Sequence, residues 1–368
     1  MRIAVAMSGG VDSSVAALLL KEQGHEVVGL SMRLYDAAGP GRSGRCCTSE
    51  DLADARRVAW TLEIPHVVLD LEAEFRDAVV RPFVASYAAG ETPIPCTDCN
   101  TKVKFAALWT RARAMGCAAV ATGHYARTAT DPRTGRRLLR KGADPEKDQS
   151  YFLWDLTSEQ LAAACFPVGD LRKADVRAHA RRAGLPTADK EESQEICFVP
   201  RGIRAGDFVA ARAGELGVPL PVLPGRVEDT SGRPLGTHAG HFRYTIGQRR
   251  GLPAASGRRY VVGIDAGSNR IVVGTADDLA TAEAEVTGLR FPSGPPDGTF
   301  RAGVRIRHRA AEAAASIEPR PDGSARILFD EPQRAVTPGQ SAVFYDGEIL
   351  LGGGVLRRAA AAPAARAS

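Results

Sequence analysis

Hydrophobic and polar positions in the first third of the chain alternate between two periods. Short apolar runs, the first at Ile3–Met7, are typical of buried strands, and each is followed by a stretch with helical spacing of its apolar residues. This alternation predicts an α/β fold in which helices cover a parallel sheet. The expected strands are Ile3–Met7, Glu26–Leu34, His66–Leu71 and Ala118–Thr122, and the expected helices are Val15–Glu22, Ser49–Leu62, about Ala73–Tyr87, about Lys102–Met115, Ser158–Ala164 and Ala174–Arg182.

The pattern changes after about residue 203. Proline and glycine become frequent from Gly214 to Gly257, and from Ala284 to Leu356 short alternating runs are separated by Asp-Gly pairs, which favour hairpin turns. This second pattern predicts a small central domain and an antiparallel β-barrel. We expect a catalytic domain at 1–203, a central domain at 204–276, a barrel at 277–358 and a disordered tail at 359–368.

Composition and charge narrow the class of protein. The chain has 368 residues, 44% of them hydrophobic, and a net charge of +5, with arginine-rich runs that are able to contact phosphates. The apolar run at the start is too short for a signal peptide, and no segment has the length of a membrane span. We therefore expect a cytoplasmic protein with no membrane partner. Its seven cysteines do not indicate a disulfide framework, which leaves metal binding, catalysis or burial.

A glycine- and serine-rich segment between the first strand and the first helix predicts a phosphate site. In Ser8–Ser14 the glycines let the backbone approach a phosphate, and the start of the helix attracts its negative charge. The lysine of a Walker A loop is missing, so a kinase-type loop is excluded. The SGGxDS pattern resembles the loop of enzymes that cleave ATP to AMP and pyrophosphate, in which Asp12 would help to hold Mg²⁺. The alternative is a glycine-rich turn that only starts a helix.

Two groups of cysteines are candidates for chemistry. Cys96 and Cys99 have CxxC spacing just ahead of a predicted helix with Lys102 and Lys104, and both features favour a thiolate. Cys99 is therefore a candidate nucleophile. The third thiol is Cys197, for which a buried structural role is the alternative. An iron–sulfur cluster on the three cysteines, or a zinc ion with His124, also stays open.

Several further motifs, taken together and in order, resemble the bacterial tRNA-specific 2-thiouridylase family. The resemblance covers nearly the whole chain. The motifs are SGGVDSS from Ser8, CCTSEDLADARRVA from Cys46, PIPCTDCNTKVKF from Pro93, ATGHYAR from Ala121, KDQSYFLW from Lys147, KEESQEICFVP from Lys190, TIGQRRGL from Thr245 and TPGQSAVFY from Thr337.

This resemblance implies an enzyme with a PP-loop ATP-binding domain that thiolates the wobble uridine of tRNAs for lysine, glutamate and glutamine. ATP, with Mg²⁺, would adenylate the C2 oxygen of the uridine. Cys197 would carry a persulfide supplied by a cysteine desulfurase or a sulfur-relay protein. Cys99 would release the sulfur, or act after its transfer, and a Cys99–Cys197 disulfide would form. The resemblance does not require a permanently bound cofactor, and a cluster stays open.

The family's pattern also implies the binding residues. The ATP site would comprise Ala6, Met7, Ser8, Gly9, Gly10, Val11, Asp12, Ser13, Met32 and Gly123. The tRNA site would comprise His124, Lys147, Asp148, Gln149, Arg307, His308 and Gln340.

Three positions depart from the family's pattern. Cys96 stands where some members have an aspartate proposed as a general acid or base, His308 where a tyrosine is common, and Thr101 where a lysine is frequent.

Two other functions use the same features in part. An amide-forming synthetase would share the ATP loop, but amidation needs no redox thiols. An RNA-binding protein with a vestigial ATP site would not need an intact SGGVDSS loop.

Overall fold

The computed structural model describes residues 1–34, 49–191, 196–253 and 257–357. Its N-terminal region contains the predicted parallel sheet, in which all five strands run in one direction. The spatial order is β3 (His66–Asp70), β2 (Glu26–Arg33), β1 (Arg2–Ala6), β4 (Ala119–Ala121) and β7 (Ala164–Cys165). Because β2 and β4 lie on opposite sides of β1, the loops after β1 and β4 separate there, and this is where such sheets bind ligands.

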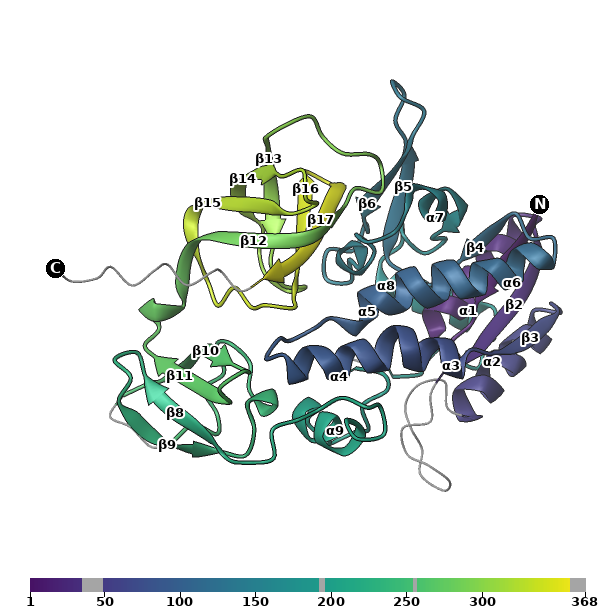
Figure 1. Ribbon diagram of the computed structural model, residues 1–368. Coiled ribbons are helices and arrows are strands. Elements are labelled where there is room, and N and C mark those ends of the chain that lie inside the picture. Colours follow the sequence, from purple (N-terminus) through teal and green to yellow (C-terminus); the bar gives the residue numbers. More distant parts are fainter. Residues whose placement is uncertain (35–48, 192–195, 254–256, 358–368) are drawn as a thin grey trace.

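Helices cover both faces of this sheet (Figure 1). They include α1 (Val11–Glu22), α2 (Ser49–Thr61) and α8 (Lys173–Arg182). Two longer helices each contain a π-helical segment. One consists of α3 (Glu72–Phe75), η1 (Arg76–Val80) and α4 (Arg81–Ala88), and the other of α5 (Pro95–Asp98), η2 (Cys99–Ala107) and α6 (Leu108–Ala114). The second helix begins seven residues earlier than predicted, so Cys96 and Cys99 lie inside it.

The predicted barrel is present and closed. Six strands pair antiparallel around it, and a pairing of β12 with β17 completes the ring. They are β12 (Ala280–Arg290), β13 (Phe300–Arg305), β14 (Ala313–Pro319), β15 (Ala325–Arg334), β16 (Ser341–Asp346) and β17 (Ile349–Arg357).

A hairpin of the catalytic region extends the barrel sheet. Strand β6 (Arg137–Lys141), paired with β5 (Ala126–Thr130), continues the sheet beside β17. One hydrophobic cluster also runs across this junction, with Tyr345 and Leu350 of the barrel packed among catalytic-region residues. The sequence pattern did not indicate that this hairpin would join the barrel.

The central region has a small core of its own. Its sheet has the order β10 (Tyr260–Asp265), β11 (Arg270–Gly274), β8 (Gly225–Asp229) and β9 (Pro234–His238). The five buried residues of this core form a cluster separate from those of the other two regions. Helix α9 (Ala205–Arg212) and the short η4 (His241–Arg243) attach the region to α4.

Two segments named from the sequence cannot be compared with the structure. The tail 359–368 and Cys46–Cys47 lie outside the described residues. Within the described residues, no helix is both long enough and apolar enough to cross a membrane.

Candidate active site

The phosphate loop lies at the carboxyl end of β1, in the switch point of the sheet. Helix α1 starts directly after Gly10, and no side chain caps its first turn, so its N–H groups are available to an anion. Gly9 has a φ of +74°, and a Cβ there would overlap the carbonyl oxygen of Asp51. The hydroxyls of Ser13 and Ser14 donate to the Gly10 carbonyl at 3.0 and 2.9 Å. The loop therefore combines a tight turn with an uncapped helix start.

The other expected nucleotide residues lie near this loop. Met32 is buried close to the end of β2, and the hydroxyl of Ser31 beside it donates to the Met7 carbonyl at 2.7 Å. Gly123 follows β4 and packs against the start of α1, where a Cβ would come within 2.6 Å of the Ser13 nitrogen. The structure thus gathers the predicted set at one edge of the sheet.

Two side chains that the sequence did not suggest hold Asp12. The Lys173 ammonium group lies 2.7 and 2.9 Å from the two carboxylate oxygens of Asp12, and the Tyr125 hydroxyl donates to one of them at 2.7 Å. Lys173 is the first residue of α8. A carboxylate beside a phosphate site suits Mg²⁺ bound with ATP, and Lys173 adds a positive charge at the same place. Only the fold brings these residues together, since they are 161 and 113 positions apart.

A second cavity, of about 630 Å³, lies between the catalytic region and the barrel. Seven of the residues that the sequence singles out line it, and several polar or aromatic side chains add to the wall. The first set is Cys96, Lys104, His124, Lys147, Asp148, Gln149 and His308, and the second includes Asn100, Glu146, Phe152, Arg305 and Arg309.

Three consecutive residues connect this cavity to the phosphate loop. Gly123 packs on the start of α1, His124 lines the cavity, and the Tyr125 hydroxyl returns to Asp12. The Gln149 side-chain oxygen accepts the Tyr125 backbone N–H at 3.0 Å, which places its carboxamide at the wall of the cavity. The nucleotide site and the cavity are therefore parts of one site.

His124 is a neutral imidazole at physiological pH. Burial lowers its pKa well below the usual value, and the nearby Lys104 ammonium lowers the pKa further. One ring nitrogen, Nδ1, lies 2.7 Å from the Thr122 hydroxyl, and the ring meets Phe166 edge-on. The ring orientation is thus fixed, as is usual for a residue that contacts a reacting group.

The three thiols occupy different environments. Cys96 is accessible to solvent, but it faces the interior of the cavity, where burial and the neighbouring Cys197 raise its pKa to about 11 and Lys104 opposes the rise. The thiolate expected at the helix start is therefore not favoured for Cys96. Cys99 is buried, with 7% of its surface exposed, and it belongs to the hydrophobic core. Cys197 is half-buried and packs against the same core.

The two lysines that were expected to favour a thiolate contact side chains of their own helix. Lys102 pairs with Asp98 at 2.6 Å, and the Lys104 ammonium donates to the Asn100 side chain at 3.0 Å. Only Lys104 lines the cavity.

The disulfide implied by the resemblance is not formed in this state, because the sulfurs of Cys99 and Cys197 are not joined. Within the described ranges, no three His, Cys, Asp or Glu side chains are gathered closely enough to hold a metal ion. Cys96, Cys99 and Cys197 therefore do not form a ligand set in this conformation.

Three of the expected tRNA residues make contacts inside the protein. The Asp148 carboxylate is buried and accepts from Arg305 at 3.1 Å and from the Ser150 hydroxyl at 3.1 Å. Arg307 donates to the Arg334 carbonyl at 2.6 Å, outside the cavity. The Gln340 amide donates to the Thr92 carbonyl at 2.6 Å, also outside the cavity.

His308 closes the cavity from the barrel side. Its ring packs on Phe152 with 4.4 Å between centroids, and its Nε2 lies 3.2 Å from the Asp148 carbonyl oxygen. Burial is the main cause of its lowered pKa. An uncharged aromatic pair is therefore present where a base could stack.

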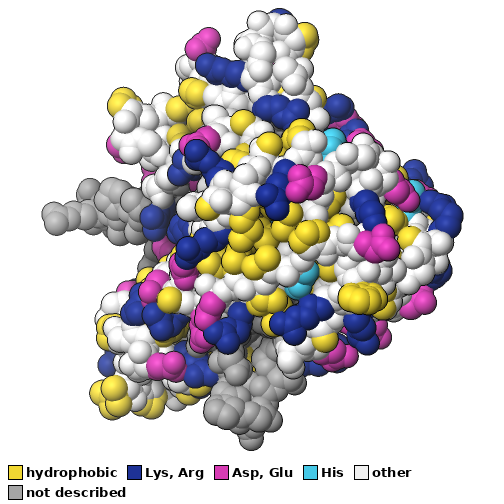
Figure 2. Space-filling model, turned by 90° about the vertical axis from the view of Figure 1, so that its right-hand side faces the viewer, with side chains coloured by type: hydrophobic (Ala, Val, Ile, Leu, Met, Phe, Trp, Pro, Cys, Tyr) yellow, Lys and Arg dark blue, Asp and Glu magenta, His cyan; other side chains and the backbone are white. Residues whose placement is uncertain are grey.

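The outer face at the catalytic end of the molecule has a different character. Figure 2 shows Lys and Arg side chains interleaved with Asp and Glu around a hydrophobic area on this face. Interleaved charges do not build the continuous positive field that attracts RNA. The cavity between the catalytic region and the barrel is the better candidate for a nucleic-acid contact.

Comparison with known proteins gives relatives over almost the whole chain. Residues 1–201 match the family described as tRNA methyl transferase HUP domain, residues 216–275 its PRC-barrel domain, and residues 282–356 an aminomethyltransferase beta-barrel domain. A protein of Geotalea uraniireducens named tRNA-specific 2-thiouridylase MnmA is 46% identical over 97% of this chain and 95% of its own. One of the same name from Moorella thermoacetica is 48% identical, over 97% and 99%.

Proposed function

The chain belongs to the tRNA-specific 2-thiouridylase family, and from that premise we propose that it replaces O2 of a wobble uridine with sulfur in tRNAs for lysine, glutamate and glutamine. The observation that carries the proposal is the single site in which the phosphate loop, a thiol, a neutral imidazole and an amide adjoin. A base taken out of its stack needs polar groups at its edge, and Gln149 and His124 supply them.

The first step is activation of the C2 oxygen. A carbonyl oxygen is a poor leaving group, and its attack on the α-phosphate of ATP converts it into adenylate while pyrophosphate leaves. The uncapped start of α1 and Lys173 stabilise the negative charge of the leaving pyrophosphate. Mg²⁺ bound with ATP at Asp12 would supply further charge neutralisation.

Sulfur transfer is the second step. A cysteine desulfurase or a relay protein loads Cys197 as a persulfide. Either Cys99 attacks the Cys197 sulfur and releases hydrosulfide, which then attacks C2, or the terminal persulfide sulfur attacks C2 first and Cys99 cleaves the S–S bond afterwards. Both routes expel AMP, leave sulfur on C2 and form a Cys99–Cys197 disulfide, which a thiol reductant must reopen before the next turnover.

The test is thiolation of an unmodified glutamate tRNA with ATP, Mg²⁺, cysteine, a desulfurase and iron-free protein. We expect Cys99→Ser and Cys197→Ser to make no 2-thiouridine, while Cys96→Ser retains activity. Cys117→Ser, at a buried cysteine that does not line the cavity, is the matched control. An absolute requirement for iron together with an equally essential Cys96 would instead identify the three cysteines as cluster ligands and refute the two-thiol mechanism.

A further inference from the structure

The Gln149 side chain is held by the backbone of a single residue, Tyr125. Its carboxamide oxygen accepts the Tyr125 N–H at 3.0 Å, and the Gln149 backbone N–H donates to the Tyr125 carbonyl at 2.9 Å. In a carboxamide the oxygen accepts hydrogen bonds and the nitrogen donates them. Because the Tyr125 N–H is a donor, the oxygen must face it, and the amide has only one possible orientation. The amide nitrogen of Gln149 therefore points away from this N–H.

This nitrogen is the part of the amide that is left for a ligand. Gln149 is half-buried and lines the cavity between the catalytic region and the barrel, and its amide nitrogen has no hydrogen-bond partner among the residues that the structure describes. The other carboxamide in the wall, that of Asn100, is fully engaged. Its nitrogen donates to the Phe152 carbonyl and its oxygen accepts from Lys104, both at 3.0 Å. Of the two amides, Gln149 is the one that offers N–H groups to the cavity.

The segment that carries Gln149 is fixed on both sides. Before it, the buried Asp148 carboxylate accepts the Gly142 N–H at 3.1 Å and a bond from Arg305 of the barrel at 3.1 Å. After it, the Phe152 N–H donates to the Gln149 carbonyl at 3.0 Å. A donor held in this way loses little freedom when it binds a base, so it is suited to discriminate between bases.

The stacking position and the reaction together limit which part of a base meets this donor. Phe152 is the ring on which His308 packs, and it lies three residues after Gln149, so a base stacked at this pair has an edge near the amide. The proposed reaction directs O2 of the base to the phosphate loop, which Gly123 contacts. On a pyrimidine the Watson–Crick edge runs from O2 through N3 to position 4. The group left for Gln149 is therefore the one at position 4.

Position 4 is where uracil and cytosine differ. Uracil has a carbonyl oxygen there, which accepts a hydrogen bond, whereas cytosine has an amino group, which donates one. Both bases have a carbonyl group at C2, so adenylation and sulfur transfer at C2 do not by themselves distinguish them. A cytosine amino group facing the Gln149 N–H groups would leave donors on both sides unpaired, and an unpaired polar group out of water is costly.

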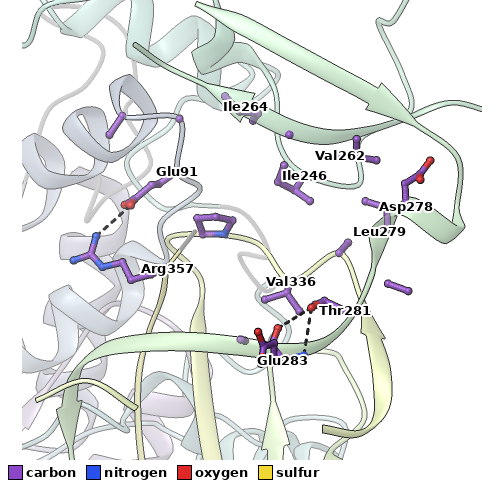
Figure 3. Close-up of a pocket in the computed structure, with 17 residues that line it drawn as sticks. Glu91, Ile246, Val262, Ile264, Asp278, Leu279, Thr281, Glu283, Val336 and Arg357 are labelled. Carbon is purple, nitrogen blue, oxygen red and sulfur yellow. Dashed lines mark hydrogen bonds and ion pairs between the residues drawn. The ribbon is translucent and has the colours of Figure 1, made fainter. Parts of the chain in front are cut away.

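The other cavity between regions, of about 380 Å³, does not offer a comparable site (Figure 3). It lies between the end of α4, the central region and the barrel. Its charged lining residues are Glu91, Asp278, Glu283 and Arg357. Glu91 already pairs with Arg357 at 3.2 Å. A wall with an excess of carboxylates repels the phosphates of RNA, so a base is better placed in the cavity that Gln149 lines.

We propose that Gln149 selects uridine over cytidine at the reacting position, by donating from its amide nitrogen to O4 of the base. The inference rests on the proposed function, since it takes the thiolated pyrimidine to be the ligand of this cavity. Tyr125 is the positioning residue. Its backbone N–H orients the amide, and its hydroxyl donates to Asp12 at 2.7 Å in the nucleotide site. Base selection and the phosphate loop are thus connected through one residue.

The experiment measures kcat/KM for thiolation of two unmodified glutamate tRNAs, one with uridine and one with cytidine at the wobble position. The products, 2-thiouridine and 2-thiocytidine, are quantified by mass spectrometry of the digested tRNA. In both reactions a C2–O bond breaks and a C2–S bond forms, so the same ATP and sulfur donor serve. We expect the parent to prefer the uridine tRNA by about 100-fold or more, as for a site that rejects an analogue with a mismatched polar group.

Two variants change the donor and keep the rest of the wall. Gln149→Glu retains an oxygen for the Tyr125 N–H and replaces the donor nitrogen with an acceptor, which suits the amino group of cytosine. The ratio of kcat/KM for uridine over cytidine should fall about 100-fold or more. Gln149→Met removes both polar atoms, and its ratio should fall below about ten. Gln333→Glu makes the same change at a barrel glutamine whose amide donates to the Glu331 carbonyl, and it should keep the ratio of the parent.

Equal losses on both tRNAs in Gln149→Glu, with an unchanged ratio, would overturn the inference, since an amide that serves O2 or only the fold affects both bases alike. The ratio does not depend on the fraction of folded enzyme, so partial unfolding does not imitate the expected result. If Gln149→Glu is inactive on both tRNAs, Gln149→Met decides. A ratio as high as that of the parent in Gln149→Met would overturn the inference.

A binding measurement separates this inference from the proposed function. The affinities of anticodon stem–loops with uridine or cytidine at the wobble position are measured without ATP or a sulfur donor. A parent that binds the uridine form more tightly, with the preference reversed in Gln149→Glu, but makes no 2-thiouridine in the complete assay would refute the proposed function and leave the selection in place. A parent that thiolates both tRNAs equally well would refute the selection alone.

Discussion

The phosphate loop and the thiol cavity adjoin in one site but are built in opposite ways. The loop is a continuous segment, and hydrogen bonds between residues three to five positions apart stabilise it. The cavity takes its wall from four segments between Cys96 and Ala310. A site for phosphate needs mainly backbone N–H groups in a set geometry, whereas a site for a base and sulfur needs several kinds of side chain. Local sequence therefore determines the first, and only the complete fold determines the second.

The largest expected effect comes from breaking the loop itself. Gly9→Ala would place a Cβ on the Asp51 carbonyl in a left-handed conformation, so we expect a loss of more than about 100-fold in ATP-dependent AMP formation. The control is Gly24→Ala, because Gly24 has a similar φ of +78° with no atom within 4 Å of the added Cβ. That change should cost about 1 kcal/mol of stability and leave AMP formation intact. Equal losses in the two variants would show that backbone strain alone, and not the contact with Asp51, is responsible.

A smaller effect is expected where a distant residue supports the loop. Lys173→Met removes a cation from Asp12 and from the phosphate site, and we expect kcat/KM for ATP to fall about 10- to 100-fold. Lys21→Met is the control, since Lys21 lies in the last turn of α1 and contacts Leu62 and Glu63. An unchanged kcat/KM in Lys173→Met would limit Lys173 to holding Asp12 in the absence of nucleotide.

These two variants also mark how far the sequence could lead. Periodicity predicted the parallel sheet and the barrel, and the SGGVDSS motif predicted the loop with Gly9 in it. No local signal identified Lys173 or Tyr125, because their relation to Asp12 arises from the folding of helices far apart in sequence. The start of the helix that carries Cys96 and Cys99 was predicted at about Lys102, but the helix begins at Pro95. Proline suits the first turn of a helix, and the residues from Pro95 to Lys102 are too few to show helical periodicity.

The cavity shows the complementary case. The CxxC spacing suggested Cys96, and the resemblance suggested His124, Gln149 and His308. The structure brings the four together, although spacing alone did not relate them. Gln340 is predicted to contact the tRNA, and in this structure its side-chain amide donates to the Thr92 carbonyl. Hydrogen-bond partners inside the protein depend on tertiary contacts, which a single sequence does not specify.

A more modest change is expected from removing the ammonium group that Cys96 and His124 share as a neighbour. Lys104 lowers the pKa of both groups, because a nearby positive charge favours the thiolate and disfavours the imidazolium. Lys104→Gln should therefore raise both pKa values. Cys96 in the variant should be alkylated more slowly at pH 8 than Cys96 in the parent, because less of the thiol is ionised. The pKa of His124, measured by NMR titration, should rise toward the usual histidine value. Movement in opposite directions would contradict this assignment.

The smallest effect is expected at the barrel side of the cavity, where His308→Tyr introduces the aromatic residue that the family resemblance leads us to expect. Stacking on Phe152 is retained, while the contact with the Asp148 carbonyl is lost, so we expect tRNA affinity to change by less than about threefold.

The same His308→Tyr variant should also change the pH dependence of stability in a defined direction. Because burial lowers the pKa of His308 in the folded state, its neutral form stabilises the protein fully above about pH 6.5, and this contribution falls as the pH drops toward the folded-state pKa. Between pH 6.5 and pH 5 the free energy of unfolding should therefore fall less in the tyrosine variant than in the parent, as measured by urea unfolding at each pH. An identical or steeper fall in the variant would show that His308 is not buried in its neutral form.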